Sequence, residues 1–322
     1  MYQIQISKTG YYLPPKIQDN HELGKLINRS EKWISSRTGV LERRIAEEPM
    51  HIVAAKAVKN AMINSPPPDC ILNASVTPLQ LIPDSSVFIQ DALNYSDIPC
   101  WSIHATCLSF LVALHSAAAM IHGGSFKRIL IVSSEVGSSF RNMKEPESAA
   151  LIGDGAAAVL VERTPDDSTS SWIDWEMATW PEGKSLTEFR GAGILRPPFI
   201  CKETTPEDYF FHMKGPVVFK MARKYTGIVL DKLKTRNRIT VKDIDWLIPH
   251  QASGPALKSA PNYGIDDKKV INIIAETGNT IAASTPMALA WAHQKKLLKR
   301  GDLLLIGGSG AGLSVAYALM RW

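Results

Sequence analysis

The two halves of the chain repeat one order of apolar segments, and this repeat constrains the fold more than any other feature. In each half a helical stretch leads into a strand-like run, and a second strand-like run follows. The segments are 108–122, 128–133 and 156–162 in the first half, and 286–299, 303–306 and 313–321 in the second. The period is half the chain, far longer than a solenoid repeat, so we expect two similar halves within one rigid body.

The remaining periodic segments complete a mixed α/β pattern. Strands are also expected at 1–6, 71–76, 173–180 and 246–248, and helices at 52–63 and 216–234. Asn20 and Ser30 are placed to be the N-caps of two short early helices. The predicted units are 1–165 and 166–322, with a variable region near 165–205 and no flexible linker between them.

Composition and charge indicate a chain with a large folded core and argue against nucleic-acid binding and against a membrane-spanning segment. With 322 residues, of which 45% are hydrophobic and 21% charged, the chain can bury a large core. The net charge of +5 is mild and forms no basic stripe, so we do not expect nucleic-acid binding. The most apolar stretch, 110–121, is too short to span a bilayer, and the N-terminus lacks the pattern of a signal peptide.

The four cysteines show neither a CxxC spacing nor a neighbouring histidine cluster, so no metal site is expected. They are Cys70, Cys100, Cys107 and Cys201. A disulfide framework belongs to short secreted chains, so free thiols in a reducing cytoplasm are the better interpretation.

Cys107 is the candidate nucleophile, because it lies between a short strand and the start of an apolar helix. A thiol at a helix N-terminus is close to free backbone N–H groups and to the positive end of the helix dipole, and both favour the thiolate. The alternative is a buried structural cysteine, and position alone leaves the two at even odds.

His250 and Asn279 are the candidate partners of Cys107. His250 follows a predicted strand, and Asn279 lies in a glycine-containing loop before a run of small residues. Taken singly, they are typical of a loop histidine and a turn residue. A Cys, a His and an Asn distant in sequence form a known nucleophilic pattern that many chains contain by chance, so an acyl-thioester enzyme remains one hypothesis.

The glycine-rich segment 307–312 resembles a nucleotide loop only superficially. Its glycine spacing does not match the dinucleotide fingerprint, a strand-like run follows it, and no Walker A sequence occurs in the chain. Closely spaced glycines are typical of backbone that approaches a ligand or another strand. We therefore expect this loop to line a site without binding a nucleotide phosphate.

Considered together, motifs along the whole chain resemble the 3-oxoacyl-[acyl-carrier-protein] synthase III family of thiolase-fold condensing enzymes. In family order they are 10–14 (GYYLP), 30–46 (SEKWISSRTGVLERRIA), 102–114 around Cys107, 153–158 (GDGAAA), 249–252 (PHQA), 278–286 (GNTIAASTP) and the C-terminal 310–322. The resemblance implies a five-layered α/β/α/β/α fold built from two duplicated halves, which agrees with the repeat.

The resemblance also implies roles for the candidate residues. Cys107 is the acyl-accepting nucleophile, and His250 and Asn279 hold the carbonyl of the second thioester. The backbone N–H groups of Cys107 and Ala311 form the oxyanion hole for the acyl carbonyl.

Further substrate contacts follow from the same resemblance. Trp33 and Arg37 match positions that contact the adenine and phosphates of coenzyme A, and Ser309 and Gly310 are expected to contact substrate. The substrates implied are acyl-CoA or acyl-carrier-protein thioesters, with no resident cofactor. A homodimer is implied too, in which the segment 81–86 approaches the partner's acyl tunnel.

The activity implied is decarboxylative Claisen condensation of the Cys107-bound acyl group with a malonyl-type or 3-oxoacyl thioester. No cysteine follows Cys201, so the second-cysteine base of degradative thiolases is missing. Pro255 stands about where the family has an Arg near its carrier-protein docking surface, and this favours specialised metabolism over ordinary fatty-acid initiation. The alternatives are acyl transfer to an alcohol, amine or second acyl chain, and a non-catalytic partner of a paralogous ketosynthase.

Overall fold

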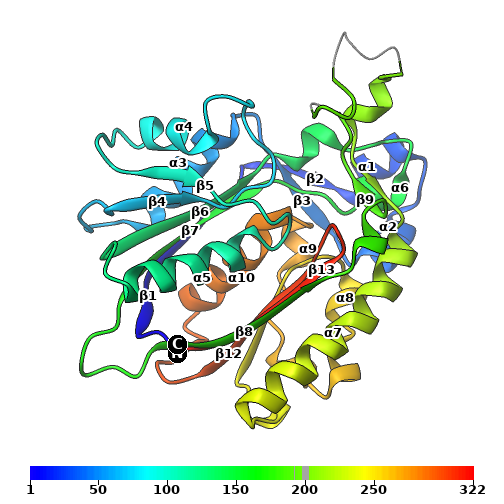
Figure 1. The fold of residues 1–322 in the computed structure, drawn as a ribbon. Helices are drawn as coiled ribbons and strands as arrows, with labels where there is room; N and C mark the ends of the chain where they lie inside the picture. Colours follow the sequence, from blue (N-terminus) through cyan, green and yellow to red (C-terminus); the bar gives the residue numbers. More distant parts are fainter. Residues whose placement is uncertain (192, 198–202) are drawn as a thin grey trace.

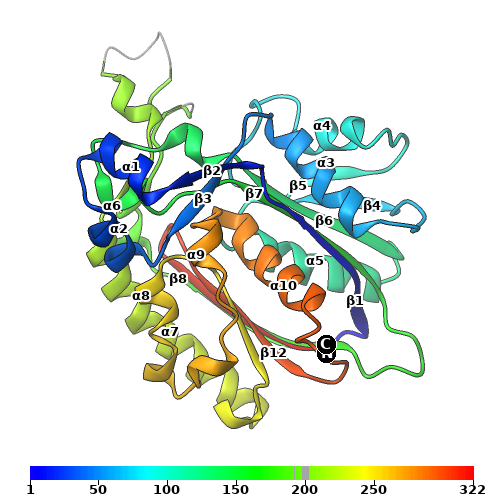
Figure 2. The ribbon, with the colours of Figure 1, turned by 180° about the vertical axis from the view of Figure 1, so that it is seen from behind.

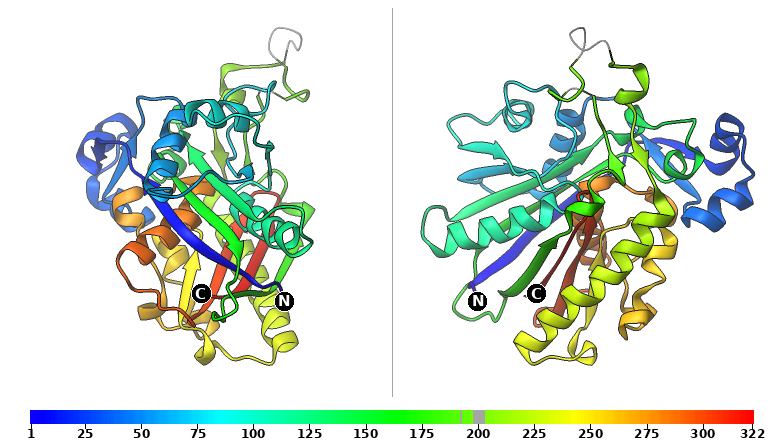
Figure 3. Two further views of the ribbon diagram at one scale, coloured as in Figure 1. Left: turned by 90° about the vertical axis from the view of Figure 1, so that its left-hand side faces the viewer. Right: turned by 45° about the vertical axis from the view of Figure 1, so that its right-hand side comes forward.

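Two β-sheets enclose a central layer of two helices in the computed structural model, which describes residues 1–191, 193–197 and 203–322 (Figures 1 and 2). Further helices cover the outer face of each sheet, and α7 lies along the second one (Figure 3). The helical layers are α3 (Met50–Ala61) with α4 (Ser85–Ala92), then α5 (Ser109–His122) with α10 (Ser284–Gln294), then α7 (Gly215–Asn237). The predicted five-layered fold is confirmed.

The two sheets share one topology. The first has the order β1-β7-β6-β4-β5, and the second has the order β8-β13-β12-β11. In both, the first three strands are antiparallel neighbours and the next pair is parallel. In the second sheet, an isolated parallel bridge between Leu247 and Val270 takes the position that β5 has in the first sheet.

The first sheet contains β1 (Ile4–Tyr12), β4 (Cys70–Asn73), β5 (Cys100–Ser102), β6 (Arg128–Glu135) and β7 (Gly155–Arg163). The second contains β8 (Ser171–Thr179), β11 (Trp246–Pro249), β12 (Leu303–Gly310) and β13 (Ser314–Arg321).

The central strands carry apolar side chains on both faces, and this explains why both faces of each sheet are covered by helices. On β6, Ile129 and Ile131 join the core around α5 and α10, whereas Leu130 and Val132 face α3. Successive side chains of a strand point to opposite faces, so an uninterrupted apolar run needs apolar partners on both. The predicted strand at 128–133 therefore lies in the middle of the molecule.

Smaller elements complete the described chain. A ribbon of two strands carries two short helices at one end of the molecule, and a second ribbon lies beside residues 137–149 (Figure 1). These elements are β2 (Lys16–Asp19), α1 (Asn20–Ile27), α2 (Glu31–Thr38) and β3 (Glu42–Ile45), then α6 (Pro146–Ala149), β9 (Thr187–Glu188), β10 (His212–Met213), α8 (Gly254–Leu257) and α9 (Ile274–Thr277). None of the helices described is long and apolar enough to cross a membrane. The unit boundary at 165 stays a prediction, and Cys201 lies outside the described residues.

Two local predictions need correction. The N-cap of α1 is Asp19, whose carboxylate accepts the Glu22 N–H, while the Asn20 amide donates to the Val40 carbonyl. The helix predicted at 286–299 ends at Gln294, because Lys296 adopts a left-handed backbone (φ 57°) that turns Leu298 into the core. The predicted Ser30 cap of α2 is confirmed.

Candidate active site

Cys107 occupies a tight turn between β5 and α5. Thr106 before it has a left-handed backbone (φ 51°), an uncommon conformation for a residue with a branched side chain. The Ser109 hydroxyl stabilises this turn, since it accepts the Ala105 N–H at 2.9 Å and donates to the Thr106 carbonyl at 2.7 Å. The helix begins two residues after Cys107, close to the predicted place, and the cysteine is half-buried.

The hairpin between β12 and β13 lies against this turn. The Ala311 N–H donates to the sulfur of Cys107, and the Thr106 hydroxyl donates to the Ala311 carbonyl at 3.3 Å. Gly310 allows this approach, because a Cβ there would lie 2.6 Å from Thr106 Oγ1. The two backbone N–H groups expected to form an oxyanion hole, those of Cys107 and Ala311, thus both point at the sulfur.

The electrostatic environment of Cys107 differs from the expectation. Burial raises the pKa of the thiol to about 12, and the charge of Glu135 raises it further, while the N–H groups of Ala311 and Cys107 act in the opposite direction. The backbone N–H groups thus act in the predicted direction, toward the thiolate, and burial of the sulfur outweighs them.

His250 directly follows β11, as predicted, and its ring is fixed by Ser284. The Ser284 Oγ lies 2.5 Å from His250 Nδ1 and accepts the Gln251 N–H at 3.2 Å. A Ser284 hydroxyl that donates to Nδ1 satisfies this network and leaves the ring proton on Nε2. Burial lowers the pKa of His250 to about 4, so the ring is a neutral N–H donor. The motif 278–286 contains Ser284, but nothing in the sequence pointed to a role for it.

Asn279 is oriented by its backbone surroundings. Its Oδ1 accepts the Ile281 N–H at 2.9 Å, which fixes the amide, and its Nδ2 donates to the Ala252 carbonyl at 3.2 Å. An amide nitrogen carries two N–H groups, so one remains for a ligand. Gly278 before it has a φ of 64°, and a Cβ there would lie 2.7 Å from the Leu151 carbonyl oxygen.

Continuous contacts connect the three predicted residues. The end of β12 touches the Cys107 turn through Gly310, and it touches His250 through Gly308, where a Cβ would lie 2.7 Å from His250 Cβ. Ala252, two residues after His250, accepts from Asn279. Side chains from both halves of the chain therefore meet around the end of β12.

A cavity of about 70 Å³ opens beside His250. Its walls come from α7, from α8 and from the ends of β12 and β13, and include the predicted substrate residue Ser309. The other principal lining residues are Phe219, Thr226, Ala252, Ala256, Tyr263 and Tyr317. Pro255, the departure noted in the sequence, is exposed in the first turn of α8, where a missing backbone N–H costs little.

Trp33 and Arg37 lie on α2, away from Cys107. The Trp33 ring is half-buried under the Arg29 guanidinium, 5.3 Å from the ring centre, and Arg37 is exposed. The end of α2 packs on the loop after His250, since a Cβ on Gly39 would lie 2.7 Å from the Gly254 Cα. The described contacts therefore place α2 beside the site, but they do not connect Trp33 or Arg37 to Cys107, His250 or Asn279.

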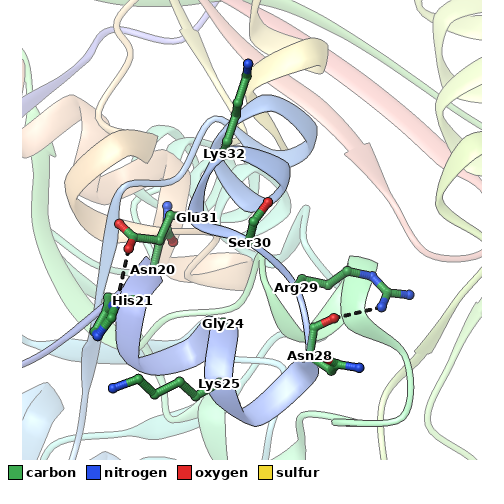
Figure 4. Close-up of a pocket in the computed structure, with 9 residues that line it drawn as sticks. All are labelled: Asn20, His21, Gly24, Lys25, Asn28, Arg29, Ser30, Glu31 and Lys32. Atoms are coloured by element: carbon green, nitrogen blue, oxygen red, sulfur yellow. Dashed lines mark hydrogen bonds and ion pairs between the residues drawn. The ribbon is translucent and has the colours of Figure 1, made fainter.

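A larger groove of about 490 Å³ lies between α1 and α2 (Figure 4). Lys25, Arg29 and Lys32 line it, and His21 pairs with Glu31 at 3.1 Å. It is basic and next to Trp33, but it contains none of the three predicted catalytic residues. Within the ranges described, no cluster of three His, Cys, Asp or Glu residues could hold a metal ion.

Comparison with known proteins agrees with this geometry. Residues 102–181 match the model of 3-oxoacyl-[acyl-carrier-protein] synthase III, and residues 235–322 match the model of its C-terminal part. The β-ketoacyl-[acyl-carrier-protein] synthase III of Rickettsia prowazekii is 32% identical, over 99% of both chains. That of Solibacter usitatus is also 32% identical, over 100% of this chain and 99% of its own.

Solved structures give the same result. The crystal structure of 3-oxoacyl-[acyl-carrier-protein] synthase III from Aquifex aeolicus has a TM-score of 0.89 and 30% identity, over 99% of this chain and 100% of the other. Xanthomonas campestris OleA has a TM-score of 0.86 at 21% identity, over 99% of each chain, which shows the shared fold alone. The chain thus belongs to the 3-oxoacyl-[acyl-carrier-protein] synthase III family of condensing enzymes.

Proposed function

We propose that Cys107 accepts an acyl group from a thioester and that the chain then condenses it with a decarboxylating malonyl-type donor. As a family member the chain is a condensing enzyme and a transferase. The observation that carries the proposal is that two neutral N–H donors, from His250 and Asn279, are connected by contacts along the end of β12 to the turn that holds a half-buried thiol.

In the first half-reaction the sulfur of Cys107 attacks the thioester carbonyl. The negative charge that forms on the carbonyl oxygen faces the N–H groups of Cys107 and Ala311, which already point toward the sulfur. The thiol proton leaves with the departing thiolate, so the step exchanges one thioester for another. The product is an acyl group on Cys107 and a free thiol of the carrier.

In the second half-reaction the donor's thioester carbonyl takes hydrogen bonds from His250 and Asn279. Loss of CO2 turns this carbonyl into an enolate, and the donors stabilise the charge as it develops, by roughly 3 kcal/mol each. The enolate carbon attacks the acyl carbon on Cys107, and the sulfur leaves as a thiolate that takes a proton from water. The product is a 3-oxoacyl thioester two carbons longer than the acyl group.

The cavity beside His250 suits the thioester end of the arm that carries the donor. Its volume is about 70 Å³. One water needs about 10–15 Å³ of such space, so the cavity holds roughly five non-hydrogen atoms. Trp33, Arg37 and the basic groove between α1 and α2 suit the adenine and phosphates of coenzyme A or an acidic carrier protein. The reaction as written needs no resident cofactor.

A homodimer completes the proposal. Strand β5 is the outer strand of the first sheet, and the nearby side chains of Leu81 and Ile82 are 72% and 86% exposed. Unpaired strand edges beside exposed apolar residues favour pairing with another chain. We expect light scattering to give twice the chain mass of 35.4 kDa.

The described free thiols suit a cytoplasmic enzyme, and cell fractionation would test that location.

The test has two readouts. Intact-mass spectrometry after incubation with a panel of acyl-CoA thioesters should show one stable acyl adduct, which Cys107→Ala abolishes and Cys100→Ala keeps. Addition of malonyl-CoA or malonyl carrier protein should release one CO2 per 3-oxoacyl product. Product without CO2 would favour plain acyl transfer, and an unacylated Cys107 with every donor would favour a non-catalytic subunit.

A further inference from the structure

Asp154 is a fully buried carboxylate that the proposed chemistry does not use. It directly precedes β7 and has no exposed surface. Its Oδ2 accepts the Ala46 N–H at 2.7 Å and the Ser138 hydroxyl at 2.6 Å, and its Oδ1 accepts the Ser138 N–H at 2.8 Å. A buried carboxylate is costly unless donors surround it, so these three hydrogen bonds make Asp154 a built anchor of the molecule.

The segment just before Asp154 holds the backbone of Asn279 from both sides. The Asn279 N–H donates to the Leu151 carbonyl at 2.7 Å, and the Gly153 N–H donates to the Asn279 carbonyl at 3.1 Å. The two segments lie so close that a Cβ on Gly153 would be 2.3 Å from the Thr277 carbonyl oxygen. The position of Asn279 therefore follows the position of the segment that Asp154 anchors.

The partner of the carboxylate, Ser138, also leads to this pair of segments. It lies in the short helical turn that follows β6. Gly137 in that turn packs on one residue of each segment, since a Cβ there would lie 2.8 Å from side-chain carbons of both Ile152 and Ile281. Ile281 donates the N–H that fixes the Asn279 amide. One buried carboxylate thus connects the turn and both segments.

We propose that Asp154 is a positioning residue for condensation, which holds the Asn279 amide in place through residues 151–153. The proposal rests on the proposed role of Asn279 as a donor to the second thioester. A donor displaced by about 1 Å can cost about 100-fold in rate. The described contacts of the Cys107 turn run to Gly310 and Ala311 instead, so acylation does not depend on this anchor.

Asp154→Asn tests the anchor with almost no change of size. In either orientation of the new amide, its NH2 group faces a backbone N–H, that of Ser138 or that of Ala46, so at least one hydrogen bond is lost. Condensation from the preformed acyl-enzyme should slow about 30-fold, less than for the removal of an oxyanion donor itself. Acylation of Cys107 should change less than twofold. An equal loss in both half-reactions would overturn the proposal.

The same substitution in an Asn279→Ala background tests whether Asp154 acts through Asn279. His250 still supplies one donor there, so a residual condensation rate is measured. Asp154→Asn should change this rate less than twofold, because the donor that it positions is already absent. A purely structural role would not distinguish the two backgrounds. A further loss of about 30-fold in the Asn279→Ala protein would therefore overturn the proposal.

Hydrogen exchange followed by mass spectrometry measures the anchoring without turnover. The Asn279 and Ile281 N–H groups are both bonded in the wild-type protein. In Asp154→Asn, peptides that cover 278–282 should exchange about tenfold faster, whereas peptides around Cys107 should be unchanged. Unchanged exchange at 278–282 would overturn the proposal. If no donor thioester condensed, the proposed function would be refuted, and exchange would still decide whether Asp154 anchors Asn279.

Ser138→Ala is a milder variant that decides the matter if Asp154→Asn does not fold. It removes the hydroxyl and keeps both backbone N–H groups that Asp154 accepts. It should slow condensation about threefold and spare acylation, as expected for one lost hydrogen bond. Equal losses in both half-reactions would count against the proposal.

Asp69→Asn is the matched control. Its carboxylate also accepts two backbone N–H groups, those of Lys127 and Arg128, but at the opposite end of β6 from Ser138. It should leave both half-reactions and the exchange of 278–282 as in the wild-type protein. If Asp69→Asn matched Asp154→Asn in every readout, the effect would be a general loss of stability and the proposal would fall.

Discussion

The Ser284 hydroxyl lies 2.5 Å from Nδ1 of His250, and the two residues are 34 positions apart in the chain. Ser284 is the first residue of α10, in the central layer, and His250 follows β11 of the second sheet. A Ser284 hydroxyl that donates to Nδ1 leaves the ring proton on Nε2. A residue of the central helix thereby orients the His250 ring.

Replacement of Ser284 by alanine should impair condensation and spare acylation. Without the hydroxyl, Nδ1 can take the ring proton and Nε2 ceases to be a donor, so the condensation rate should fall roughly 100-fold, as for the loss of one oxyanion donor. The acylation rate of Cys107 should change less than twofold, because His250 acts on the second thioester. Rapid-quench assays of the two half-reactions measure both rates.

Ser284→Thr is the matched control, since it keeps the hydroxyl on the same backbone position. It should restore most of the condensation rate. Equal losses in both half-reactions of Ser284→Ala would show that Ser284 supports the whole site rather than the His250 ring.

The second prediction concerns pH. The pKa of His250 is lowered to about 4 by burial, so the ring stays neutral from pH 5.5 upward and becomes charged only as the pH falls through about 4. Acylation removes the thiol of Cys107 from the titration. Single-turnover condensation from the preformed acyl-enzyme should therefore be independent of pH between 5.5 and 8. A rate that drops below pH 6.5 would indicate a His250 with an ordinary pKa.

The strands and the three catalytic candidates could be predicted because their signals are local. A buried strand such as 128–133 is a short apolar run between turn signals, and Cys107, His250 and Asn279 each stand in a recognisable motif. The layers were implied by the family resemblance, and the repeat agrees with them, because two halves that each bury apolar strands on both faces need helices between and outside the sheets.

The electrostatics and the supporting contacts could not be predicted, because they depend on residues far apart in the chain. Burial raises the pKa of Cys107 and outweighs the backbone N–H groups near it, and this burial depends on packing by residues far away in the chain. Asp19 and Asn20 are both good caps, so only the backbone geometry distinguishes them.

The third prediction uses two glycines of β12 that support different halves of the chemistry. Gly308→Ala should push against His250, where the new Cβ would lie 2.7 Å from His250 Cβ, and should slow condensation more than acylation. Gly310→Ala should push against Thr106 Oγ1 at 2.6 Å and slow acylation. Each should lower the free energy of unfolding by about 1–3 kcal/mol, the cost of overpacking.

Gly227→Ala is the control for both glycine variants. It lies inside α7, where a Cβ would have no neighbour closer than 4.0 Å. Alanine there should raise the free energy of unfolding by about 1 kcal/mol and leave both half-reactions unchanged. The same loss of rate in all three variants would contradict the assignment of Gly308 and Gly310 to separate steps.

The last prediction tests the cavity beside His250. Ala256→Leu adds three carbons to a half-buried residue on α8 that lines the cavity, and should fill much of its volume of about 70 Å³. Because both thioesters need room for the arm that carries them, the KM of each should rise about tenfold, which corresponds to about 1.4 kcal/mol of lost binding. Iodoacetamide, a small alkylating reagent, has no such arm, so the labelling rate of Cys107 should stay within twofold.

Lys258→Leu, an exposed change just after the same helix, is the control and should leave both KM values and the labelling rate unaltered. If Ala256→Leu slowed iodoacetamide as much as the thioesters, the variant would have closed the Cys107 turn itself, and the thioester arm would have to enter by another route.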